Sequence, residues 1–77
     1  MNNIKTIAFL AALNAKRVTL TERIIRYTAY VAADKALIEK SEKHARKYAS
    51  RLRNHEMKLE RYKNALAKIE ATLAANA

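Results

Sequence analysis

The sequence predicts an all-α fold, in which a short N-terminal helix is followed by a long helix with a heptad repeat. Three observations support this prediction. The chain contains neither Gly nor Pro, the residues that most often form turns and stop helices. Ala, Leu, Lys, Arg and Glu dominate its composition, and these are strong helix formers. Apolar residues also recur at every seventh position, at Ala45, Leu52, Leu59, Leu66 and Leu73.

The N-terminal helix is expected over residues 1–15, where Ile7 to Leu13 form an apolar run. Its apolar side chains surround most of the helix, which favours burial over a solvated amphipathic helix. A secretory signal is not favoured, because cleavage after Ala15 would place Leu13 where a small residue is preferred. The uncharged stretch from Thr6 to Ala15 is also shorter than the ~20 residues that span a bilayer. We therefore expect a cytoplasmic, intracellular protein.

A break between the two helices is expected at residues 14–21. Thr19 and Glu22 match the capping box S/T-x-x-E, which would start a new helix at about Leu20. The heptad frame argues against this break, because Leu10, Leu13 and Leu20 lie on it when it is extended backwards. The sequence thus predicts a long helix over residues 19–76 within one helical domain, residues 1–77.

The positions of each heptad are labelled a to g, and an apolar seam at a and d runs the length of this helix. One helix cannot hide such a seam, so a helix from the same chain or from another copy must cover it. We expect a self-associating coiled coil, with a homo-oligomer as the first partner. A compact helical hairpin or a three-helix bundle is the alternative. The predicted association seam is Ile24, Val31, Ile38, Leu52, Leu59, Leu66, Ile69 and Leu73.

The seam is interrupted at residues 34–45, where Asp34 and Ser41 occupy d positions. Buried polar groups cost free energy unless they find partners, so this segment is expected to pack weakly. Two interpretations stay open. Asp34 could cap a further helix at a hinge, or the polar residues could set the register of a continuous coiled coil.

The charge of the chain indicates an anionic partner. Sixteen Lys and Arg against seven Asp and Glu give a formal net charge of +9. Many of the cations lie between Lys43 and Lys63, and several share the outward b and c positions. A row of cations on a helix neutralises phosphates without reading bases. The predicted nucleic-acid-binding residues are Lys40, Arg46, Lys47, Arg53, Arg61 and Lys68.

No constellation in the sequence indicates an enzyme, a metal site, a cofactor or a small-molecule substrate. Cys is absent. His44 and His55 would lie ~16 Å apart along one helix, too far to share a zinc ion. Tyr27, Tyr48 and Tyr62 occupy d positions, where packing into the seam is favoured over base stacking.

Our leading hypothesis is therefore a non-enzymatic, basic coiled-coil protein that binds nucleic acid through phosphates without strong sequence specificity. The alternative is a small protein–protein adaptor or inhibitor, of the kind found among viral or phage accessory and structural proteins, that docks on a larger acidic partner. A third hypothesis is contact with a membrane surface. The residues expected to contact a protein partner or a membrane are Ile4, Ile7, Phe9, Leu10 and Leu13.

Overall fold

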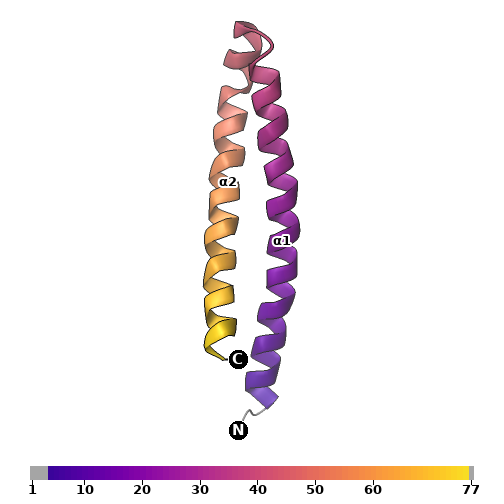
Figure 1. Cartoon of the computed structure of the whole chain (residues 1–77), viewed down its shortest axis with the longest axis vertical. Coiled ribbons are helices and arrows are strands. Elements are labelled where there is room, and N and C mark those ends of the chain that lie inside the picture. The colour runs from indigo at the N-terminus through magenta and orange to yellow at the C-terminus, as the bar shows by residue number, and fades with distance from the viewer. Residues whose placement is uncertain (1–3, 77) are drawn as a thin grey trace.

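The chain folds into two antiparallel helices joined by a tight turn (Figure 1). The computed structural model describes residues 4–76. Helix α1 spans Ile4–Ile38 and helix α2 spans Glu42–Ala75. Together they form a rod with extents of 61 × 14 × 14 Å. The predicted all-α fold is confirmed, in the hairpin form that the sequence left as the alternative.

The predicted continuous helix over residues 19–76 is wrong at one place, because α1 ends at Ile38 and the chain reverses at Glu39–Ser41. The Ser41 backbone is extended, with φ −171° and ψ 164°. Its hydroxyl oxygen accepts a hydrogen bond from the His44 backbone N–H at 3.2 Å, which caps α2. The chain therefore reverses with a serine cap at the start of α2 and without Gly or Pro. Asp34, which the sequence offered as a helix cap, lies inside α1 instead.

The break predicted at residues 14–21 is also absent, because α1 is continuous through this segment. The polar side chains bond back to the preceding turn instead of starting a new helix. The Thr19 hydroxyl donates to the Ala15 carbonyl at 3.2 Å, and the Thr21 hydroxyl donates to the Arg17 carbonyl at 2.8 Å. The Asn14 side-chain amide donates to the Leu10 carbonyl at 3.1 Å. The N-terminal helix and the first part of the long helix are therefore one element.

The heptad seam is the surface along which α1 and α2 pack. All eight predicted seam residues are buried or half-buried. Residues at d in one helix lie opposite residues at d in the other: Tyr27 contacts Tyr62, and Asp34 contacts His55. The partner helix that the sequence required is therefore supplied by the same chain.

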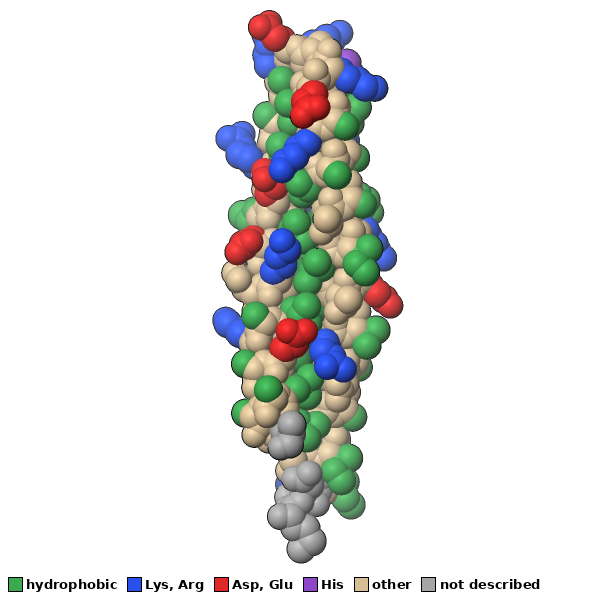
Figure 2. Space-filling model, viewed as in Figure 1, with side chains coloured by type: hydrophobic (Ala, Val, Ile, Leu, Met, Phe, Trp, Pro, Cys, Tyr) green, Lys and Arg blue, Asp and Glu red, His purple; other side chains and the backbone are tan. Residues whose placement is uncertain are grey.

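The core of the hairpin is thin. Among the described apolar residues only Val31 is classed as buried, with 9% of its surface exposed. The other seam residues stay half-buried, because a second helix covers only one side of each stripe. Figure 2 shows these apolar side chains as a line between the helices, flanked by charged side chains. Within residues 4–76 neither helix has a segment long and apolar enough to cross a membrane.

Candidate nucleic-acid interface

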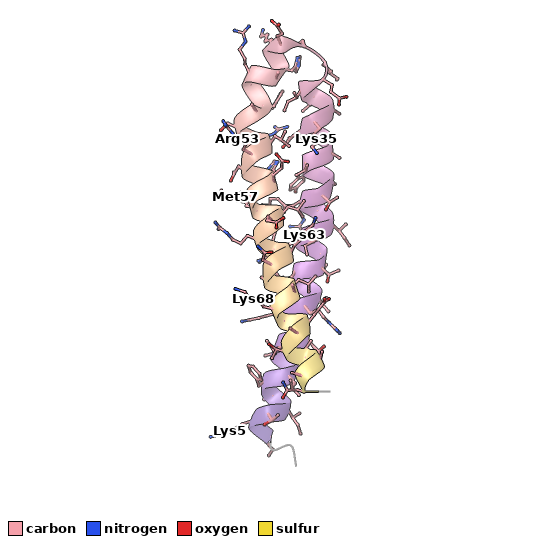
Figure 3. All side chains as sticks on the ribbon, turned by 60° about the vertical axis from the view of Figure 1, so that its left-hand side comes forward. Lys5, Lys35, Arg53, Met57, Lys63 and Lys68 are labelled. Atoms are coloured by element: carbon pink, nitrogen blue, oxygen red, sulfur yellow. The ribbon has the colours of Figure 1, made fainter. Side chains whose placement is uncertain are left out.

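The six cations predicted to bind nucleic acid are all exposed. Lys40 lies in the turn, and the other five lie on α2. Figure 3 shows Arg53 on the outer side of α2, away from α1. Among the described residues these five make no hydrogen bond or ion pair to α1, and Arg46 pairs only with Glu42 on its own helix, at 3.8 Å.

The hairpin adds cations from α1 that the sequence prediction did not include. Lys16 and Arg23 line a shallow groove between the helices, together with Lys68 of α2. The floor of this groove is apolar and includes Leu20 and Ile69 from the seam. Cations that are far apart in the sequence thus share one surface.

A second recess continues this surface along α2. It is lined by Met57, Glu60, Arg61 and Asn64, and it shares Ala65 and Lys68 with the groove. Glu60 is the one carboxylate that lines either depression. The two depressions therefore hold four cations against one anion, all of them in the part of the chain that the structure describes.

Further cations of this surface lie over the tyrosine rings of the seam. The Arg23 guanidinium is 5.6 Å from the centroid of the Tyr62 ring, and the Lys58 ammonium is 5.9 Å from that of Tyr27. Both contacts join α1 to α2. The Lys47 ammonium lies 5.5 Å from the Tyr48 ring. These cation–π contacts hold the long side chains over the seam and keep their charged ends near solvent.

We name this surface the basic edge. It consists of six cations, at g in α1 (Lys16 and Arg23), at g in α2 (Lys58) and at c in α2 (Lys47, Arg61 and Lys68). No g position of either helix carries Asp or Glu. The e positions of α2 carry Glu42, Glu56 and Glu70 instead, and Glu70 lines a separate depression with Arg17 and Glu22. The g positions thus carry no carboxylate, whereas the opposite edge mixes Glu42, Glu56 and Glu70 with Lys35 and Lys63.

A polar cluster centred on Asp34 lies near the turn. The Asp34 side chain is 2% exposed and uses both carboxylate oxygens. Its Oδ1 accepts from Arg51 Nε at 2.8 Å and also lies 2.8 Å from an Arg51 Nη atom. Its Oδ2 is 2.6 Å from His55 Nδ1. Both residues belong to α2, so the cluster ties the helices together.

The pKa of the Asp34 carboxyl reflects two opposing effects. Burial raises this pKa. The hydrogen bonds from His55 and Arg51, together with the charges of these two residues, lower it by a larger amount, so the pKa lies below its ordinary value. The carboxyl is therefore ionised at neutral pH, and His55 Nδ1 is the donor in their hydrogen bond. The unfavourable burial expected at this d position is thus offset by two partners.

Aromatic rings enclose the cluster. The His55 ring is 5.3 Å from the Tyr30 ring and 5.6 Å from the Tyr27 ring, measured between centroids. A shallow recess lined by Tyr30, Ala33, Asp34, Arg51 and His55 opens over it. Within residues 4–76 no group of three or more His, Asp or Glu is placed to hold a metal ion. The cluster is accounted for as an ion pair that joins the helices.

The residues predicted to contact a protein partner or a membrane are not on one face. Leu10 and Leu13 are half-buried on the seam, while Ile4, Ile7 and Phe9 are exposed. Ile4 and Ile7 lie at b and e, whereas Phe9 lies at g on the other side of the helix. The structure therefore does not bring the five together as one contact surface.

Two groups of residues were missed from the sequence. Lys16, Arg23 and Lys58 join the site only because α1 folds against α2, but their shared g position was a usable signal. The pairing of Asp34 with Arg51 and His55 needed the position of the turn, which sets the antiparallel register. Comparisons with protein-family models, curated protein sequences and solved structures find no match.

Proposed function

We propose that this protein is a basic helical hairpin that binds nucleic acid through phosphate contacts, without strong sequence specificity. The observation that carries the proposal is the basic edge, where cations from both helices line one surface of a rod. On this proposal the chain has no catalytic role and acts in the cytoplasm.

The arrangement of the basic edge suits a phosphate backbone. Its six cations follow the rod axis from Lys47 near the turn to Lys16 and Lys68 nearer the other end. A linear polyanion lying along the rod would meet these charges in sequence and release its condensed counterions. The absence of carboxylates at the g positions removes repulsion along this path.

The aromatic residues beside this edge support phosphate contact over base recognition. Tyr27, Tyr48 and Tyr62 are half-buried in the seam, and cations lie against their rings. Rings held in this way are occupied by packing, so they offer little free surface for stacking on bases. Phosphate contacts position a protein but carry no sequence information.

The test is fluorescence anisotropy of a labelled random-sequence DNA duplex, titrated with the protein between about 50 and 200 mM salt. A duplex RNA, a single strand and polyglutamate are measured alongside. The proposal expects the logarithm of the association constant to fall linearly with the logarithm of the salt concentration. The slope should be about 0.9 per phosphate contact on duplex DNA.

Matched variants locate the site. Lys16→Gln, Arg23→Gln and Lys68→Gln together remove three charges from the groove. Arg17→Gln, Lys35→Gln and Lys63→Gln remove the same three charges from positions a and e, away from the basic edge. The first variant should weaken binding at least tenfold and reduce the slope by about 0.9 for each lost contact. The second variant should change the slope by less than about 0.9, the value for one phosphate contact.

Two results would overturn the proposal. Equal loss in both triple variants would show that binding follows net charge and not the basic edge. No binding to DNA or RNA at the lowest salt would reject a nucleic-acid partner and favour an adaptor or inhibitor for an acidic protein. Circular dichroism of each variant, with unchanged helicity, separates these results from unfolding.

A further inference from the structure

Helix α1 carries a second heptad line on the side that faces away from α2. Ile4, Ala11, Val18, Ile25 and Ala32 occupy successive b positions. Ile4 is 85% exposed, Val18 56% and Ile25 67%. Among the described large apolar side chains classed as exposed, all but Met57 belong to α1. The hairpin therefore covers one apolar side of α1 and leaves another in water.

The neighbouring f positions widen this line into a face. They hold Ala8, Ala15, Glu22, Ala29 and Ala36, so Glu22 is the one charged residue in the b and f rows of α1. We name these ten residues the outer α1 face. In Figure 2 green side chains recur along the outer border of α1, consistent with this pattern.

The hairpin exposes more surface than a compact protein of its mass. The chain exposes 5962 Å², whereas a compact monomer of its mass exposes about 4,800 Å². The rod therefore exposes roughly 1,200 Å² more than a compact fold of its mass. A contact along one helix that buried the usual ~600 to 1,000 Å² per partner would remove much of this excess. A chain of this size with a thin core, no Cys and no metal group among its described residues also needs association as its remaining source of stability.

The form of the outer α1 face identifies the partner. A seven-residue spacing over most of a helix matches a second helix of similar length, because only a rod covers such a line from end to end. The small Ala side chains allow a close approach. A face that is almost free of charge is also compatible with its own copy in a two-fold contact, where the same patch serves both partners. A second copy of this chain meets all three conditions.

We propose that the protein dimerises through the outer α1 face, with the two α1 helices at the centre and the two α2 helices outside. This surface differs from the a and d seam, which the hairpin uses internally. The b and f positions point away from g, so dimerisation leaves both basic edges open. The proposal does not depend on nucleic-acid binding.

The test is sedimentation equilibrium of the full chain over a range of concentrations, at a salt concentration that screens its positive charge. The wild type should reach twice the 8.8 kDa chain mass. Val18→Glu with Ile25→Glu should sediment as a monomer. Val18→Ala with Ile25→Ala, which keeps the helix propensity high, should raise the dissociation constant at least tenfold.

The control is Thr19→Glu with Met57→Glu. This control adds the same two negative charges. Met57 is as exposed as Val18, at 56%, but Met57 lies on α2. This control should dimerise like the wild type. A wild type that stays monomeric would overturn the proposal, and a lipid surface or another protein would then be the partner to test for the outer α1 face. A dimer that persists in the Val18→Glu, Ile25→Glu variant would also overturn it, because the copies would then meet elsewhere, as they would in an exchange of α2 helices.

Discussion

Asp34 is the residue on which the joining of the two helices near the turn depends most. It is the one described charged side chain that is fully buried, and it holds Arg51 and His55 of the other helix. Removing one member of a buried ion pair is costly, because the remaining groups lose their partner. Arg51 is 45% exposed, so water compensates part of that loss. We therefore expect the cluster to fix the register of the two helices more than it adds net stability.

Asp34→Asn should lower the free energy of unfolding by about 1 to 3 kcal/mol, because an amide cannot balance the charge of Arg51 and accepts only one of the two hydrogen bonds. Replacing Asp34 and His55 together by Leu should restore the stability or exceed that of the wild type, because apolar contacts then fill this layer of the seam. Urea unfolding followed by circular dichroism measures both variants. A fully stable Asp34→Asn variant would contradict this account of the cluster.

The same carboxylate predicts how stability depends on pH. Its folded pKa lies below the ordinary value of 3.8, so the unfolded chain takes up a proton first as the pH falls. The stability that Asp34 contributes is therefore complete above about pH 4 to 5 and is lost as the pH falls through the lowered folded pKa. Thermal unfolding between neutral and acidic pH should show this loss in the wild type. The variant with Leu at positions 34 and 55 should lose less, and identical pH profiles would contradict the prediction.

At the scale of the elements, the turn explains what the sequence could and could not predict. The heptad frame correctly identified the face of each helix that would be covered, because apolar spacing depends only on helix geometry. The frame continues without a shift from Ile38 to Ala45, so it carries no signal that the chain reverses there. At Thr19 the sequence predicted a helix start that is absent. Its hydroxyl donates to the Ala15 carbonyl inside a continuous helix and caps no new one.

Ser41 should be the residue that fixes the start of α2. Ser41→Ala removes the acceptor for the His44 backbone N–H and should destabilise the hairpin by about 1 kcal/mol. Ser50→Ala is the matched control, since Ser50 is exposed within α2 and Ala is the better helix former. Thermal unfolding of the two variants compares them. Equal stability would show that the turn does not depend on this cap.

For the whole molecule, the hairpin places cations and exposed apolar residues, which are mixed along the sequence, on two different surfaces. The outer cations of α2 could be predicted, because they share positions within one helix. Lys16 and Arg23 share the g position in the sequence, but their place beside Lys68 could not be assigned without knowing that α1 lies antiparallel to α2. The apolar b line of α1 was equally visible in the sequence, but only the position of α2 shows that it is left uncovered.

The antiparallel register leads to an expectation about the order in which the rod opens. Asp34 lies 17 residues from Arg51 and 21 from His55, so their contacts close short loops. Contacts nearer the chain ends, such as Tyr27 with Tyr62, close longer loops, and each doubling of loop length costs about 0.6 kcal/mol of entropy. On this basis we expect folding to start near the turn and the free ends to open first. The groove that holds Lys16 and Lys68 lies in the half farther from the turn, so on the proposed function a bound polyanion would stabilise the end of the rod that is expected to open first.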